Sequence, residues 1–342
     1  MPDNTLIMPA VRERPTITDV ARLCGVTPAT VSRVLNGKKK FSTSEAVREK
    51  ILATAQKLGY VPDLAARNLN RQSSHIIGLF ASPQTHVAEG INESLIEGIA
   101  QTMHVGGYDV FFELAPSGGN ALPFWRFDGA ILMQAPRPET VTELDRRRVP
   151  YVCVNERVGN PVAAVLADDV MGMNRALEHL AQLGHRRIAY ANARPSYLSH
   201  YSVIDRYETL LAGARERGIE LVDGHDVPFS SATDFLRDAV IESGATAIIT
   251  YDHNIATTLV GAALPLGLRI PERFSLICFN DVFPVALLPP PLTAVAVSGR
   301  EMGRVGADLL LNSIIATKPH AKREIRVPED LIVRASTARP PS

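Results

Sequence analysis

The stretch TITDVARLCGVTPATVSRVLNG, residues 16–37, specifies the architecture of the N-terminal part of this chain. Its first half predicts a short helix, because Thr16 can cap free backbone amides and Asp19 lies three residues on, as in a capping box. Gly25 ends this helix, since glycine adopts a left-handed turn at little cost. The apolar side of the helix consists of Val20, Ala21 and Leu23.

The second half of the stretch predicts another helix. Thr27 caps it, Pro28 occupies its first turn, where a missing N–H does no harm, and Asn36-Gly37 ends it. The residues spaced to pack on the first helix are Val31, Val34 and Leu35. Two short helices joined by a tight glycine-containing turn, in a basic context, form a helix-turn-helix, whose second helix enters the major groove of DNA.

A third helix completes this N-terminal region. Ser42 and Glu45 have the capping-box spacing, and Gly59 ends the helix. Residues 62–72 then predict one short helix that is marginal on its own, because nucleation costs more than a few turns return. The apolar residues that recur at helical spacing and close a three-helix core are Val47, Ile51, Leu52, Ala55 and Leu58.

The second helix carries side chains that suit DNA. Arg33 can donate a bidentate pair to a guanine edge, and Ala29 can touch a thymine methyl. The alternative for each residue is a plain surface position, and for the whole arrangement it is a structural helical hairpin. The side chains better placed for phosphates are Thr27, Thr30, Ser32 and the run Lys38-Lys39-Lys40.

The charge of the chain is distributed unevenly. The 342 residues have a formal net charge of +0, yet residues 12–72 hold twelve Lys and Arg against five Asp and Glu. The basic segment suggests that only the N-terminal part meets a polyanion. With 46% hydrophobic residues, no membrane-length apolar run and no basic-then-apolar start, we expect a cytoplasmic protein. The cysteines expected as buried free thiols are Cys24, Cys153 and Cys278.

Beyond His75, short apolar strands alternate with helices. This alternation predicts parallel, doubly wound α/β sheets. The expected strands are 76–80, 108–113, 129–133, 150–154, 187–191, 247–250 and 275–279. The expected helices are 91–103, 139–147, 173–183, 201–217, 255–264 and 302–316.

Three N-terminal segments resemble the lactose-repressor (LacI/GalR) family: ITDVARLCGVTPATVSRVLNG, KILATAQKLGY and PDLAARNLNRQSS. The resemblance implies a flexible tail over 1–14, an all-α helix-turn-helix domain over 15–61 and a hinge over 62–74 that folds on the operator. Two hinge helices would pair over the minor groove, where Leu69 is wedged into the central step. The residues expected to bind DNA are Thr16, Thr27, Pro28, Ala29, Thr30, Ser32, Arg33, Asn36, Lys38, Ala66, Leu69 and Asn70.

The body resembles the same family's effector domain through EHLAQLGHRRIAY, LPLGLRIPERFSLICFND and PPPLTAV. The resemblance implies a two-lobed, periplasmic-binding-protein-like domain over 75–342 for effector binding and dimerisation. A ligand would bind in the cleft, at the carboxyl ends of strands. The lobes would span about 75–169 with 296–330 and about 170–295, with crossings near 169–172, 280–284 and 292–298.

The family's ligand positions, carried over one by one, are Asp168, Arg206, Asp252 and Asn280. Carboxylate, guanidinium and amide groups can together bind several hydroxyls, as in a sugar or related polyol. Each aspartate has an alternative as a helix cap or loop residue. The departures from the family pattern, all on the ligand side, are Asp252-His253 in place of an Asn-Asp pair, a short 113–128 segment with Phe124 and Trp125, and the stretch 82–92.

These features predict a sequence-specific transcription regulator, a repressor that binds a near-palindromic operator as a homodimer and responds allosterically to a small effector. Hinge pairing and two half-sites require two copies. The last residues, Arg339–Ser342, contain no leucine heptads, so we expect a dimer and not a coiled-coil tetramer. Ligand closure would reorient the first lobes and change operator affinity. No cofactor and no membrane partner are expected.

Two other classes compete with this interpretation. A solute-binding receptor would need an export signal, and none is expected from the first residues. An enzyme could use His253 beside Asp252, or His185 and His200 near Arg206, as acid–base groups. The chain has no phosphate-binding glycine loop, nucleophile elbow or metal-ligand spacing, so we expect no enzyme.

Overall fold

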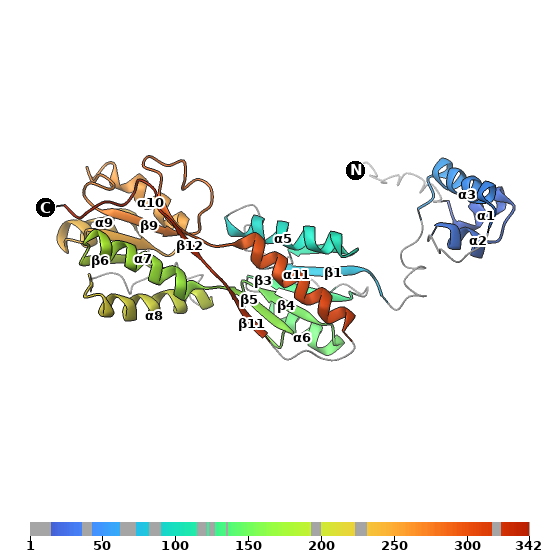
Figure 1. The fold of residues 1–342 in the computed structure, drawn as a ribbon, viewed down its shortest axis with the longest axis horizontal. Helices are drawn as coiled ribbons and strands as arrows, with labels where there is room; N and C mark the ends of the chain where they lie inside the picture. The colour runs from blue at the N-terminus through green and yellow to red at the C-terminus, as the bar shows by residue number, and fades with distance from the viewer. Residues whose placement is uncertain are drawn as a thin grey trace, which may run out of the picture. The chain divides into compact units, whose positions relative to one another are not determined.

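The computed structural model divides the chain into two compact units, Met1–Ser74 and His75–Ser342 (Figure 1). The described residues are 15–35, 43–61, 73–81, 90–114, 122, 127–134, 136–192, 200–222, 231–316 and 323–341.

The described residues of the first unit form three packed helices, α1 (Ile17–Cys24), α2 (Pro28–Leu35) and α3 (Glu45–Leu58). Thr16 and Asp19 form the expected capping box, and Gly25 ends α1 in the left-handed conformation. Thr27 Oγ1 accepts a hydrogen bond from the Thr30 amide at 3.2 Å, as a cap of α2 should. The buried apolar core consists of Val20, Ala21, Cys24, Val31, Val34, Ile51 and Ala55.

Three details of this unit differ from the sequence prediction. Ser44 precedes α3 at the cap position, without a side-chain cap hydrogen bond, whereas the sequence pattern favours Ser42, which lies outside the described residues. Leu23 and Leu52 are exposed because their helical positions face away from the three-helix core. The core is therefore smaller than the apolar pattern predicts.

The second unit contains two lobes, each built on a six-stranded sheet. The first lobe has the strand order β11-β5-β4-β3-β1-β2, and α5 (Ile91–Val105) and α11 (Gly299–Ile315) lie side by side on one face of it (Figure 1). Leu144 of α6 (Pro138–Arg147) packs in the cluster on the other face. The strands are β1 (Ile76–Ala81), β2 (Asp109–Leu114), β3 (Gly129–Met133), β4 (Tyr151–Val154), β5 (Ala163–Ala167) and β11 (Arg323–Val327).

The second lobe has the order β12-β10-β9-β8-β6-β7, in which β12 (Asp330–Ile332) pairs antiparallel to β10 (Thr293–Ala296). The parallel strands beside them are β9 (Ser275–Phe279), β8 (Ala247–Thr250), β6 (Arg187–Ala191) and β7 (Glu220–Leu221). The helices are α7 (Asp169–Leu183), α8 (Tyr201–Glu216), α9 (Ala232–Leu236), a π-helical segment (Arg237–Glu242) and α10 (His253–Ala263).

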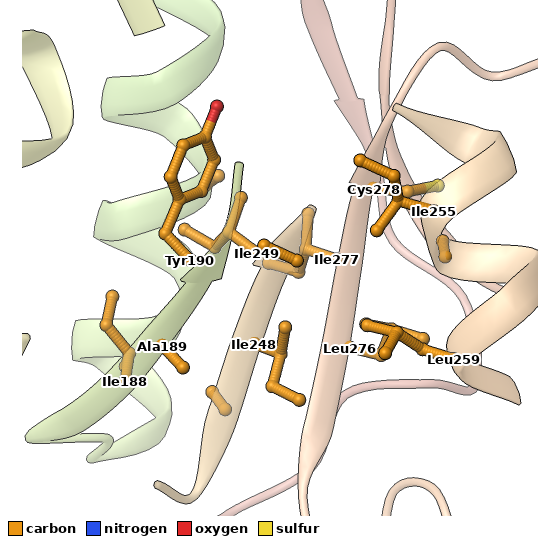
Figure 2. Packing of buried hydrophobic residues seen from close by; sticks show 14 of the residues in the cluster. Ile188, Ala189, Tyr190, Ile248, Ile249, Ile255, Leu259, Leu276, Ile277 and Cys278 are labelled. Atoms are coloured by element: carbon orange, nitrogen blue, oxygen red, sulfur yellow. The ribbon is translucent and has the colours of Figure 1, made fainter. Parts of the chain in front are cut away.

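Apolar strands hold the second lobe together. In Figure 2, Leu276 and Cys278 of β9 lie beside Leu259 and Ile255 of α10. These four side chains are completely buried, as continuous apolar strands covered by helices should be. All three cysteines of the chain are buried free thiols, as expected.

The chain crosses between the lobes three times, and one crossing differs from the prediction. The first lies between β5 and α7, and the second between β10 and α11. The third lies between β11 and β12 at residues 328–329 (Figure 1). The expected crossing near 280–284 is wrong, because β9 and β10 on either side of it belong to the same sheet. Among the described residues, no helix is long and apolar enough to cross a membrane.

Candidate nucleic-acid interface and interlobe site

The outer face of α2 presents the side chains expected to read DNA. Val31 and Val34 point into the core, while Pro28, Ala29 and Arg33 are exposed. Thr16 and Thr27 are exposed on the preceding caps, and Thr30 and Ser32 are half-buried. Helical periodicity alone produces this separation, because residues three and four apart share a face. The remaining expected DNA-binding positions lie outside the described residues: Asn36, Lys38, Ala66, Leu69 and Asn70.

The four expected effector residues all lie just beyond strand ends or on the helix that follows. Asp168 follows β5, Asp252 follows β8 and Asn280 follows β9. Arg206 lies in the second turn of α8, rather than at its start, and bonds to the backbone beyond β8. The carboxyl ends of parallel strands are where open α/β sheets present ligand-binding groups.

Arg206 is buried and held rigidly at the boundary of the lobes. Its Nε donates to Asp169 Oδ1 at 2.5 Å and its Nη1 donates to the Tyr251 carbonyl at 2.5 Å. The guanidinium carbon lies 3.9 Å from the Phe279 ring centroid and 4.9 Å from that of Tyr251. Nη2 has no hydrogen-bond partner among the described residues. This side chain can therefore offer one prepositioned donor edge to a polar ligand.

The two aspartates cap helices, so the alternative role that the sequence left open is present for both. Asp168 Oδ1 accepts from the Met171 amide at 3.1 Å, and Asp252 Oδ1 accepts from the Ile255 amide at 2.8 Å. Each cap uses one oxygen. Asn280 has a left-handed backbone, with φ of 70°, which asparagine tolerates better than most residues.

The N-terminus of α8 contacts the first lobe directly. Tyr201 is buried among Leu132, Cys153 and Leu166 of the first lobe, and its hydroxyl accepts from the Ala167 amide at 3.0 Å. The same hydroxyl donates to Asn155 Oδ1 at 2.9 Å. Packing and hydrogen bonding at Tyr201 thus join the two lobes beside the first crossing.

A hydrogen-bonded chain continues from this contact toward Arg206. His200 Nε2 lies 2.9 Å from the Asn155 carbonyl, and its Nδ1 lies 2.7 Å from Ser202 Oγ. Ser202 Oγ is 2.8 Å from the Tyr251 hydroxyl, and the Tyr251 carbonyl accepts from Arg206. Because an imidazole with a carbonyl at Nε2 is a donor there, Nδ1 is the acceptor.

The histidines considered for acid–base chemistry do not come together. His185 contacts Thr246 and Ser275 at the amino ends of β8 and β9, the sheet edge opposite Arg206. His253 lies in the first turn of α10, against Gly90 of the first lobe. Among the described residues, no group of three or more His, Cys, Asp or Glu side chains is arranged to hold a metal ion.

The second unit also has an open groove of about 1250 Å³. It runs along α5 and α11 and is bordered by His253 and the loop with Phe283. None of the four expected effector residues lines it, although its lining includes His253 and Asp281, which directly follow Asp252 and Asn280 in the chain. Phe283 is 80% exposed there, which is unusual for a large aromatic side chain.

Several residues of the interlobe site are missing from the sequence prediction. Asp169 and Tyr251 bind Arg206, Asn155 and Tyr201 join the lobes, and Glu329 is buried at the third crossing. The sequence does contain a signal for Asn155 and Tyr251: both carry polar groups and directly follow buried strands, where ligand-binding residues of open α/β sheets lie. No local pattern marks Glu329, because a Val-Pro-Glu-Asp segment is typical of an exposed turn.

Two family models match the two units. The description "Bacterial regulatory proteins, lacI family" matches residues 16–63, and "Periplasmic binding protein-like domain" matches residues 177–337. The HTH-type transcriptional regulator CelR of Thermobifida fusca is 29% identical over 317 residues, covering 89% of this chain and 93% of that protein. The probable HTH-type transcriptional repressor ExuR of Bacillus subtilis (strain 168) is 27% identical, covering 95% and 98%.

Solved structures share the fold over nearly the full length. The lac repressor dimer bound to operator and the anti-inducer ONPF has a TM-score of 0.77 at 23% identity, covering 95% of this chain and all of that one. The transcriptional regulator CelR–cellobiose complex has a TM-score of 0.66 at 24% identity, covering 94% and 100%. The chain thus joins a lacI-family helix-turn-helix region to a two-lobed, periplasmic-binding-protein-like body, which is the composition of a DNA-binding transcriptional regulator.

Proposed function

We propose that this regulator is a repressor that binds a near-palindromic operator as a homodimer and releases or tightens on it when a sugar or related polyol enters the interlobe site. The observation that carries the effector half is Arg206, buried and fixed by Asp169 and Tyr251, with one donor edge left over. A fixed donor stacked over aromatic rings suits a hydroxyl-rich ligand, because sugars present polar edges and apolar faces.

The proposed base-reading residues are Arg33 and Ala29 on the exposed face of α2. The proposed backbone contacts are Thr16, Thr27, Pro28, Thr30, Ser32, Asn36 and Lys38, and the proposed minor-groove contacts are Ala66, Leu69 and Asn70. The proposed effector residues remain Asp168, Arg206, Asp252 and Asn280, each of the two caps retaining a second oxygen for a ligand.

The DNA half is tested by selecting binding sites from random duplexes and titrating the enriched site by fluorescence anisotropy. Arg33→Ala should cost about 1–3 kcal/mol on the selected site and relax preference at one base pair. Arg22→Ala is a matched control, because it removes another exposed arginine, from α1, and leaves the reading face intact. No enriched palindrome, or equal selectivity of the two variants, would contradict the assignment.

The effector half is tested by calorimetry with cellobiose, ribose and glucose, the sugars named in complexes of related regulators. Asn280→Ala and Arg206→Lys should weaken binding of the responding sugar, since a lysine cannot reproduce the fixed fork of a guanidinium. Arg215→Ala, exposed on the same helix, is the control. Turnover of any sugar or glycoside by the purified protein would contradict our proposal that it is not an enzyme.

Dimerisation finds support in the exposed apolar side chains of one loop, Phe283 at 80% and Leu287 at 76%. Large exposed apolar residues mark interaction surfaces. Two copies would also match two half-sites of a palindrome. Sedimentation of the purified chain tests this, and a monomer at micromolar concentration would argue against it. Because its target is chromosomal DNA, we place the protein in the bacterial cytoplasm.

A further inference from the structure

Two carboxyl groups are buried where the chain crosses between the lobes. Asp169 begins α7 just after the first crossing, and Glu329 lies in the third crossing between β11 and β12. Both side chains are 0% exposed. Asp169 Oδ1 accepts from Arg206, but Asp169 Oδ2 and both Glu329 oxygens have no hydrogen-bond partner among the described residues. Buried carboxylate oxygens without partners are costly and demand an explanation.

The Glu329 carboxyl group is packed against the elements that flank all three crossings. A Cβ atom on Gly172 of α7 would overlap Glu329 Oε2, so this carboxyl fills the space that the glycine leaves. The same Cβ would lie 2.8 Å from Cγ1 of Val295, near the end of β10 and the second crossing. Glu329 thus lies in one crossing and packs beside second-lobe residues next to the other two, so a change in the path of the crossings would alter its surroundings.

The charges around Glu329 do not balance when every carboxyl group is ionised. The carboxyl groups of Asp168 and Asp169, at the start of α7, repel an ionised Glu329, and the guanidinium of Arg206 in α8 attracts it. Glu329 also interacts electrostatically with Tyr201 of α8. Nearby Arg326 of β11 is already paired with Asp205 at 2.7 Å and Glu324 at 3.2 Å. The pKa of Glu329 is raised to about 8, mainly by burial and to a smaller extent by repulsion from Asp169. Attraction to Arg206 lowers the pKa but does not offset these two effects.

We propose that the buried Asp169–Glu329 carboxyl pair is a proton-binding site, which links proton uptake to the arrangement of the two lobes. The proton comes from solvent and resides on Glu329 while the crossings are packed as here. When the lobes rearrange and water reaches the carboxyl group, Glu329 returns the proton to solvent as a carboxylate. Rising pH therefore favours the rearranged lobes, and falling pH favours the arrangement described here.

Proton binding by Glu329 is measured from the pH dependence of the unfolding free energy. The full chain and its Glu329→Gln variant are compared between pH 6 and 9. Glutamine has the shape of the protonated acid and cannot ionise. Relative to this variant, the folding constant of the unaltered chain should fall by up to about tenfold per pH unit from pH 6 to 8 and level off above. Asp330→Asn, which alters the neighbouring exposed acid, should leave the profile unchanged. Parallel profiles of Glu329→Gln and the unaltered chain would overturn the proposal.

A spectroscopic measurement keeps the test decisive should Glu329→Gln fail to fold. The unaltered chain should show a carboxylic-acid carbonyl band in the infrared at pH 6.5, where ordinary carboxyl groups are ionised. The band should be lost by pH 9. Its absence at pH 6.5 would mean that no buried carboxyl group holds a proton.

The link to the lobes is tested by distance measurements between spin labels. Val105→Cys on α5 and Leu264→Cys at the end of α10 place labels at exposed positions in different lobes, and the native cysteines are buried. Labelled protein is diluted into unlabelled protein to suppress distances between copies. The distance distribution should change between pH 6.5 and 8.5, and should stay constant in Glu329→Gln. A titrating proton without any change in distance would overturn the link. Neither DNA nor sugar is needed, so failure of the proposed function would be seen separately.

Discussion

The contact between α5 and α11 allows a sharp prediction about Gly303→Ala. The two helices approach backbone to backbone, because a glycine on each faces the main chain of the other. A Cβ atom at Gly303 would overlap the Leu95 carbonyl oxygen and lie 3.1 Å from the Ile99 nitrogen. A backbone on a helix cannot swing aside as a flexible side chain can. The helices must therefore separate by about 1 Å to restore ordinary van der Waals distances.

The size of the effect follows from two opposing contributions. Overpacking of this kind costs about 1–3 kcal/mol or more, and separation also loosens the completely buried side chains of Leu95, Ile99 and Met302. Alanine returns about 1 kcal/mol through its higher helix propensity. We expect a net loss of about 2 kcal/mol in the free energy of unfolding.

Gly261→Ala is a matched control. Gly261 lies inside α10, is exposed, and would have no neighbouring atom within 4 Å of an added Cβ atom. Only the propensity gain remains there, so this variant should be more stable than the parent by about 0.5–1 kcal/mol. Urea unfolding followed by circular dichroism measures both. Equal stability of the two alanine variants would refute the backbone contact between α5 and α11.

Four further predictions follow from individual contacts. Thr16→Ala should lower the stability of the N-terminal unit by about 1 kcal/mol through loss of the capping box, as measured by amide hydrogen exchange of α1. Tyr201→Phe should cost about 1–3 kcal/mol in urea, because a buried backbone amide loses its acceptor, whereas Tyr190→Phe, whose buried hydroxyl has no partner among the described residues, should be neutral or stabilising. Burial lowers the pKa of His185, so the unfolded chain takes up a proton at higher pH than the folded chain does. The contribution of His185 to stability is therefore complete above about pH 6.5 and decreases as the pH falls below it. In denaturant titrations, His185→Gln should make this decrease less steep. Phe283→Asp should weaken self-association in sedimentation while Phe283→Tyr does not, and equal behaviour of the two would remove the loop from the interface.

The headpiece and the order of elements follow from the sequence because they depend on local chemistry. Thr16, Asp19 and Gly25 act on backbone groups within a few residues, so their spacing alone predicts where α1 begins and ends. The expected strands and most helices of the body are marked by apolar runs between turn residues, and their expected bounds agree with the structure within a few residues. The β5, β7, β10, β11 and β12 strands were missed, because short, alanine-rich or half-polar runs carry little periodic signal.

Which polar groups meet at the lobe boundary depends on tertiary packing. The sequence places Asp252 correctly after a strand, but for Asp168 and Asp252 alike it cannot separate a helix cap from a ligand contact, because both roles require the same residue at the same place. Tyr201 joins the lobes and Glu329 is buried only because segments distant in the chain pack together at the crossings. Local propensity carries no information about such contacts. Their energies depend on burial and on charged groups that are distant in the sequence but close in the fold. Local chemistry thus specifies a DNA-reading headpiece and a two-lobed body, whereas long-range packing sets the electrostatics between the lobes.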